Sequence, residues 1–172
     1  MNESKTKTGI RFGIITGIVY ILVLVARYYL GTTPTQLGMA SVAGYAIVVV
    51  CFYLAAKARK KELGGMADLK ELFGTVFIVI LITELCFSVF NYVYLRYLDP
   101  GYLDRFGSST LEWMRQVKAP EKEMETFRQT LEEQKQTSFG TLALGFARAV
   151  VMDSLVGLVI AFALKKNKPV VS

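Results

Sequence analysis

The sequence contains no histidine and only two cysteines among its 172 residues. The lack of histidine excludes histidine-based metal sites and the histidine general bases that activate serine or cysteine nucleophiles. The two cysteines, Cys51 and Cys86, both stand inside apolar stretches, and no Cys-x-x-Cys motif occurs. We therefore expect free buried thiols rather than a disulfide or a redox pair.

Motifs for nucleotide binding and hydrolysis are also absent. The chain has no glycine-rich phosphate-binding loop, no dinucleotide-binding fingerprint and no G-x-S-x-G nucleophile elbow. An intramembrane aspartyl protease would need two aspartates on neighbouring helices, and only Asp153 lies within an apolar run. These absences predict a protein that is not an enzyme and that uses no cofactor and no metal.

Long apolar runs are the main feature that the sequence does have. Hydrophobic residues make up 53% of the chain, and four runs cover about residues 9–30, 38–56, 72–98 and 139–164. Each is long enough to cross a hydrocarbon core of roughly 30 Å as a helix. A cleaved signal peptide is the competing interpretation of the first run, but its apolar core would be too long and no A-x-A motif follows. The sequence therefore predicts an all-α polytopic membrane protein, with one domain over 1–172 and four transmembrane helices in a bundle.

Turn and capping residues mark the ends of these spans. Arg27, followed by two tyrosines, is predicted to lie at the membrane interface, and Pro34 is predicted to break the helix after it. The glycine pair at 64–65 predicts the end of the second helix, and Asp68 is placed to cap the third. The Asp-Pro-Gly sequence at 99–101 predicts a turn after the third span.

The segment 99–138 is polar and is predicted to be a helical excursion outside the membrane, between the third and fourth spans. Ser108 or Ser109 is placed to cap a short helix over 111–118, and Pro120 suits the first position of a second helix. An apolar stripe on this second helix consists of Met124, Phe127 and Leu131. The stripe either packs against the rest of the protein or serves as the contact face of a sensor.

The distribution of charge predicts the orientation of the chain. The 20 basic and 14 acidic residues are not evenly spread, because the loop after the first span carries no charge and the excursion holds six Lys or Arg against eight Asp or Glu. Short basic segments stay in the cytoplasm, so we expect a bacterial inner-membrane protein with both termini cytoplasmic and no nucleic-acid partner. The basic clusters are Lys5, Lys7 and Arg11, then Lys57, Arg59, Lys60, Lys61 and Lys70, and finally Lys165, Lys166 and Lys168.

Small residues recur at four-residue spacing on two spans, and such rows allow helix backbones to approach closely. The candidate packing rows are Gly9, Gly13 and Gly17 on the first span, and Gly145, Ala149, Asp153, Gly157 and Ala161 on the fourth. We expect most of them to pack helices within the chain. The alternative is that one face, that of the first span in particular, joins a second copy or another membrane protein, while the lipid bilayer surrounds the rest.

Polar and ionisable residues inside the spans form a candidate cluster. Glu84 stands near the middle of the third span, and Ser88 and Asn91 follow on the same helical stripe. Asp153 stands at a similar depth on the fourth span, and Arg148 lies nearer the outer face. Because lipid offers these groups no partners, the stripe should face protein or enclosed water.

Three interpretations of this candidate cluster stay open. Two acids and one base could move a proton or a cation, as in a small transporter or channel component. Alternatively, Arg148 pairs with one acid and the other is a neutral, hydrogen-bonded carboxyl that fixes the helix register. Arg148 could also extend toward the outer face, since helical side chains lean toward the N-terminus of their helix. We expect a non-enzymatic interaction or structural membrane protein, with a small transporter or channel component as the alternative. A polar cavity that reaches Glu84 would favour the alternative, and a dry stripe would favour the first.

Several stretches of the sequence resemble a known family. They are GYAIVVVCFYLAAKARKKELGGMADLKELFG, YLRYLDP at the close of the third span, and VGLVIAFALKK at the close of the fourth. Their recurring features are Gly44-Tyr45, the Gly64-Gly65 turn, Asp99-Pro100 and the basic tail. Over nearly its whole length the chain thereby resembles the Bacteroidota family of small four-pass membrane proteins catalogued as a domain of unknown function. The resemblance implies an inner-membrane location and no established activity.

Overall fold

The computed structural model describes residues 3–30, 33–136 and 138–166, and within these ranges the chain is helical apart from turns and one isolated backbone bridge. The elements are α1 (Glu3–Leu30), α2 (Pro34–Glu62), α3 (Leu69–Val93), the π-helix η1 (Tyr94–Leu98), α4 (Tyr102–Gln116), α5 (Glu121–Lys135) and α6 (Phe139–Leu164). α1, α2, α3 with η1, and α6 are long and apolar enough to cross a membrane, with mean hydropathies of 2.0 to 2.3. The predicted all-α class with four candidate spans is confirmed.

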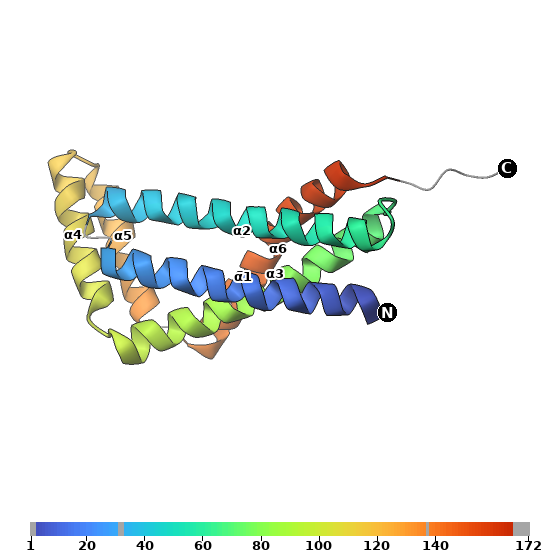
Figure 1. Ribbon diagram of the computed structural model, residues 1–172. Coiled ribbons are helices and arrows are strands. Elements are labelled where there is room, and N and C mark those ends of the chain that lie inside the picture. The colour runs from blue at the N-terminus through green and yellow to red at the C-terminus, as the bar shows by residue number, and fades with distance from the viewer. Residues whose placement is uncertain (1–2, 31–32, 137, 167–172) are drawn as a thin grey trace.

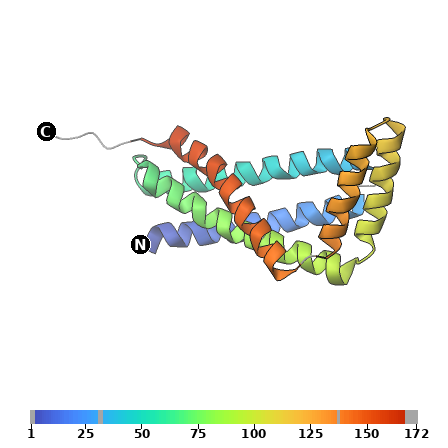
Figure 2. The same cartoon turned by 180° about the vertical axis from the view of Figure 1, so that it is seen from behind.

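The long helices lie side by side, and the two short ones cover one end. Figure 1 shows α4 and α5 running across the end at which α1 finishes and α2 begins. Seen from behind, α6 crosses α3 obliquely (Figure 2). We call the end covered by α4 and α5 the hairpin end. The opposite end, where α1 and α3 begin and where α2 and α6 finish, is the lysine-rich end.

The long helices extend beyond the predicted apolar spans, because a helix does not stop where its apolar residues stop. α1 begins at Glu3, and α2 runs to Glu62. Pro34 is not a loop residue as predicted but the first residue of α2, so this helix begins before the predicted second span at 38. Its fixed φ and missing N–H suit that position. Thr33 caps the helix through reciprocal hydrogen bonds with Gln36.

The predicted end of α2 and the predicted start of α3 are confirmed. Gly64 and Gly65 close α2 with φ angles of 69° and 85°, a region that residues with a Cβ rarely adopt. Asp68 caps α3 by accepting a hydrogen bond of 2.7 Å from the backbone N–H of Glu71. At its far end α3 widens into η1, and the turn at 99–101 follows.

The predicted starts of the two short helices are wrong. α4 begins at Tyr102, directly after the turn, so Ser108 and Ser109 lie inside the helix instead of capping it. Backbone bonding to the turn sets this start, since the Tyr102 N–H donates to the Asp99 carbonyl at 3.1 Å. α5 begins one residue later than predicted, with Pro120 at the capping position and Glu121 as its first residue.

The apolar stripe of α5 packs on α4. Met124 and Leu131 are buried, and Leu131 lies against Gly107 of α4. The rings of Phe127 and Phe106 meet edge to face with their centroids 6.1 Å apart. The structure therefore uses the stripe to hold the α4–α5 hairpin together.

The glycine row of the first span lies against α3. A Cβ added at Gly9, Gly13 or Gly17 would come within 2.8–2.9 Å of an α3 side chain. The α3 residues in these contacts are Ile78, Ile82 and Cys86. This face of α1 is occupied by α3 within the chain.

The small residues of α6 divide into two groups along the helix. Gly157 and Ala161 are buried, and a Cβ at Gly157 would lie 2.9 Å from Val76 of α3. Nearer the hairpin end, a Cβ at Gly145 would meet nothing within 4 Å, and Ala149 is only half-buried. α6 is therefore tightly packed toward the lysine-rich end and leaves open space toward the hairpin end.

A buried arginine joins three helices at the lysine-rich end. Arg59 of α2 is 1% exposed and contacts Glu71 of α3 at 2.8 Å and Glu62 at 3.1 Å. It also donates to Ser4 of α1 at 2.8 Å, and Thr8 of α1 donates to Glu62 at 2.7 Å. From the sequence, Arg59 was one of the basic residues predicted to set the topology. In the structure its side chain is buried at the centre of an ion-pair network.

Candidate functional site

A cavity of about 530 Å³ lies between α1, α3, α4, α5 and α6 toward the hairpin end. It occupies the space that α6 leaves beside Gly145 and Ala149. Its polar lining consists of Arg27, Glu84, Ser88, Asn91, Gln134 and Thr141. The α3 stripe of Glu84, Ser88 and Asn91, predicted to need protein or water opposite it, thus lines a cavity.

Two carboxyl groups meet at one side of this cavity. Glu84 and Asp153 are each 5% exposed, and their side chains are hydrogen-bond partners between α3 and α6. The Tyr45 hydroxyl of α2 donates a second bond of 2.9 Å to Oδ1 of Asp153. Ionised carboxylates offer only acceptors, so a bond between two carboxyls requires a proton on one of them. Two carboxyl groups this close repel each other when both are ionised, so the pair is a candidate site for a bound proton.

Asn91, the residue of the α3 stripe nearest the hairpin end, is held by aromatic residues. The Tyr28 hydroxyl of α1 donates to Oδ1 of Asn91. The Tyr28 ring stacks on Tyr94 of η1 with centroids 4.0 Å apart, and Tyr102 of α4 meets it edge to face at 4.7 Å. These contacts tie α1 to the hairpin and fix the wall of the cavity.

The structure does not bring Arg148 to the two acids. Its side chain is exposed, it does not line the cavity, and no ion pair of Arg148 occurs in the described part of the chain. Its separation of five residues from Asp153 turns it to a different face of α6. Of the three ionisable residues predicted to cluster, only Glu84 and Asp153 meet.

The cation beside the cavity is Arg27, which the sequence assigned to the membrane interface. Its guanidinium lies 5.9 Å from the centre of the Tyr28 ring. Its Nε is buried and makes no hydrogen bond among the described residues, and the buried Tyr102 hydroxyl lies beside the same guanidinium. Burial raises the pKa of Tyr102, an effect that the positive charge of Arg27 opposes. An arginine with an unused N–H therefore stands at the cavity wall beside a tyrosine hydroxyl.

A second, smaller cavity continues the first toward the outer surface of the hairpin end. It measures about 350 Å³ and shares Asn91 and Gln134 with the first. Arg96, Asp104 and Lys135 give it a charged rim. Lys135 of α5 contacts Asp104 of α4 at 2.8 Å, and this bond, followed by one to Glu132, raises the pKa of Lys135. The second cavity thus adjoins the first at the hairpin end.

On the lysine-rich side the acid pair rests on packed side chains. Thr83 precedes Glu84 and is fully buried, and Val76, Val79 and Ile80 of α3 are also 0% exposed. Val76, Val79 and Ile80 pack in one cluster with Phe52 of α2. The pair thus faces a cavity on one side and an apolar core on the other.

The sequence interpretation did not place several residues of the site in the candidate cluster, namely Arg27, Tyr28, Tyr45, Tyr102, Gln134 and Thr141. A signal for Tyr45 is present, because a hydroxyl well inside a span needs a partner there. No such signal distinguishes Arg27, since an arginine at the end of a span suits both the interface and a cavity. Among the described residues, no three His, Cys, Asp or Glu residues gather in a way that could hold a metal ion.

Comparison with known proteins gives a family. The model described as "Protein of unknown function (DUF4199)" matches residues 11–166. No curated protein and no solved structure matches the chain. The family resemblance of the sequence is confirmed, and the bacterial group stays a prediction. The chain belongs to the DUF4199 family, whose function is unknown.

Proposed function

We propose that the protein is a non-enzymatic multi-pass membrane protein that takes a small polar solute into the cavity and exchanges a proton at Glu84 and Asp153. In this role it is a small transporter or a component of one. The observation that carries the proposal is the cavity itself, which reaches a buried carboxyl pair instead of ending on a dry stripe. Buried ionisable groups that face a cavity within membrane spans mark proton or solute pathways.

The chemistry of the cavity wall suggests what the solute carries. Its volume of about 530 Å³ falls within the range of small-molecule sites. The unsatisfied Nε of Arg27 and the Tyr102 hydroxyl suit an anionic or acceptor group. The acid pair suits a proton or a cationic group. We therefore expect a small solute with an acceptor group bound near Arg27.

The hydrogen bonds suggest where the exchangeable proton resides. The Asp153 carboxyl already accepts a hydrogen bond from the Tyr45 hydroxyl. The simplest arrangement has Glu84 donate its proton to Asp153, and Glu84 is the member of the pair that lines the cavity. Loss of this proton to cavity water would leave two adjacent carboxylates that repel each other. Deprotonation would thereby weaken the contact between α3 and α6.

The proposed location is the bacterial inner membrane, with both termini cytoplasmic. Support comes from the clustering of Lys57, Lys60, Lys61 and Lys165 at one end of the long helices, because short lysine-rich segments remain in the cytoplasm. The hairpin end, with the cavity, then faces the periplasm. The solute and the proton would enter from that side.

The test is proton movement in liposomes that contain the purified protein and a trapped pH dye. Under an imposed membrane potential we expect the wild type to change the internal pH and the Glu84→Gln and Asp153→Asn variants to lose that activity. Glu112→Gln removes an exposed carboxyl of α4 and serves as the matched control. In infrared spectra, the wild type should show a protonated carboxyl band that Glu84→Gln removes.

A different pattern would overturn the proposal. If Glu84→Gln lowers only the yield of protein in the membrane, and proton movement per molecule is unchanged, the pair has a structural role. The alternative function, a non-enzymatic interaction or structural protein, would then be preferred.

A further inference from the structure

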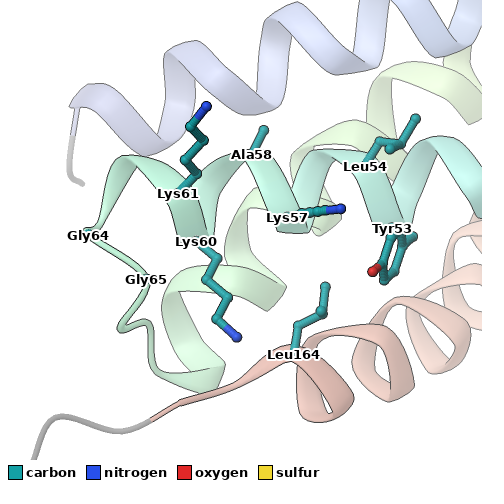
Figure 3. Close-up of a pocket in the computed structure, with 9 residues that line it drawn as sticks. All are labelled: Tyr53, Leu54, Lys57, Ala58, Lys60, Lys61, Gly64, Gly65 and Leu164. Atoms are coloured by element: carbon teal, nitrogen blue, oxygen red, sulfur yellow. The ribbon is translucent and has the colours of Figure 1, made fainter.

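The lysine-rich end carries a groove that is separate from the cavity. It lies between the end of α2 and the end of α6 and measures about 710 Å³. Its apolar part is formed by Tyr53, Leu54 and Leu164, and Lys57 and Lys60 stand at its edge. Figure 3 shows Lys60 extending from α2 toward Leu164 of α6.

The lysines at this groove are not neutralised by neighbouring acids. Arg59, between them in sequence, turns inward and takes the carboxylates of Glu62 and Glu71. Lys57 and Lys60 form no ion pair among the described residues, and Lys57 lies 6.0 Å from the centre of the Tyr53 ring. The buried arginine therefore uses the nearby acids and leaves the positive charge of the groove uncompensated.

The glycine turn beside the groove adds space but no donors. Gly64 and Gly65 have nothing within 4 Å of an added Cβ. Their N–H groups already donate to the carbonyls of Lys61 and Lys60 at 3.0 and 2.9 Å. An anion in the groove would therefore be held by lysine ammonium groups rather than by backbone amides.

We propose that this groove binds an anionic phospholipid, with its phosphate at Lys57 and Lys60 and an acyl chain along Leu54 and Leu164. The sequence of apolar and then positively charged side chains along the groove supports a phospholipid. Tyr53 and Leu54 are 41% and 45% exposed within an apolar span, and the lysines follow at the end of that span. Positive charge at the end of an apolar surface complements an anionic headgroup above an acyl chain. The leaflet depends on the proposed orientation, but the binding itself does not.

The first test is lipid binding by the detergent-solubilised full-length protein, measured by native mass spectrometry. We expect phosphatidylglycerol to bind at least tenfold more tightly than zwitterionic phosphatidylcholine. The Lys57→Gln/Lys60→Gln variant should lose roughly 25-fold in affinity for phosphatidylglycerol, since each lysine near an anionic lipid contributes about fivefold. The control Lys118→Gln/Lys122→Gln removes the same charge at the hairpin end and should bind as the wild type does. Equal binding of the two lipids, or unchanged binding by the first variant, would overturn the proposal.

A second measurement uses the unaltered chain and does not depend on the folding of a variant. An amine-reactive reagent is applied to the protein in nanodiscs of phosphatidylglycerol or of phosphatidylcholine, and labelling is read by mass spectrometry. Lys57 and Lys60 should be labelled several-fold less in phosphatidylglycerol, with Lys118 and Lys122 unchanged. Equal labelling in both lipids, or equal protection by soluble glycerol 3-phosphate, would exclude the lipid. Neither measurement involves proton movement, so failure here leaves the proposed function of the cavity intact.

Discussion

Replacing Arg59 by methionine should destabilise the protein far more than removing an exposed charge from the same end. Arg59 is 1% exposed, with its guanidinium 2.8 Å from Glu71 and 3.1 Å from Glu62. Breaking a buried ion pair costs about 3–5 kcal/mol, because the remaining charge loses its partner. Glu71 is 28% exposed and Glu62 is 41% exposed, so water can rehydrate both carboxylates in part. We therefore expect a loss of roughly 2–4 kcal/mol in the free energy of unfolding.

The assay is reversible unfolding in mixed micelles, followed by far-ultraviolet circular dichroism. The matched control is Lys70→Met, which removes one exposed positive charge from the same end and should change stability by less than about 0.5 kcal/mol. Both variants remove one charge, so an effect of charge on membrane insertion would appear equally in each. A double-mutant cycle with Glu71→Gln isolates the coupling between Arg59 and Glu71. If Arg59→Met is as mild as Lys70→Met, or the coupling is zero, the network does not hold the helices together as argued.

Two further predictions concern helix packing and access to the cavity. Gly13→Val should destabilise by roughly 1–3 kcal/mol in the same assay, since a Cβ at Gly13 would lie 2.9 Å from Ile82. In the control Gly38→Ala, the added Cβ meets open space, so this variant should be neutral or more stable. Equal effects of the two substitutions would contradict the α1–α3 contact. In a background without Cys51 and Cys86, Gly145→Cys should react with a membrane-impermeant thiol reagent added outside cells, and Leu144→Cys, whose side chain is 66% exposed away from the cavity, should not. Labelling of both or of neither would contradict a water-filled, outward-facing cavity.

Hydropathy and local turn chemistry are enough to predict the architecture of this chain. The four spans follow from the length of the apolar runs, and the ends of α2 and α3 follow from the glycine pair at 64–65 and from Asp68. These features depend on residues close in sequence. The starts of α2 and α4 were predicted less well, because Pro34 suits both a break and a first turn and because backbone bonding to Asp99, not a serine cap, sets the start of α4.

The candidate site was only partly predictable, and helix rotation explains the difference. The spacing of Glu84, Ser88 and Asn91 places them on one stripe whatever the helix packs against, so their common orientation is a local property. The depth of Glu84 and Asp153 within their spans predicts that they can meet. Which side of α6 faces α3 depends on Gly157 and its contact with Val76, a long-range fact that periodicity alone does not contain. Arg148 was therefore included in the predicted cluster, although that rotation turns it outward.

Two arginines show that position at the end of an apolar run does not predict the environment of a basic side chain. Arg27 and Arg59 each stand near the end of an apolar run, where basic residues usually mark the membrane interface. In the structure Arg59 pairs with Glu62 and Glu71, and Arg27 lies beside a cavity without an ion pair among the described residues. The charge of Arg59 at the lysine-rich end is consequently paired with carboxylates, although its Nε, like that of Arg27, makes no hydrogen bond among the described residues, and the charge of Arg27 at the hairpin end is not paired there. This asymmetry is the physical reason to look for a ligand at Arg27 rather than at Arg59.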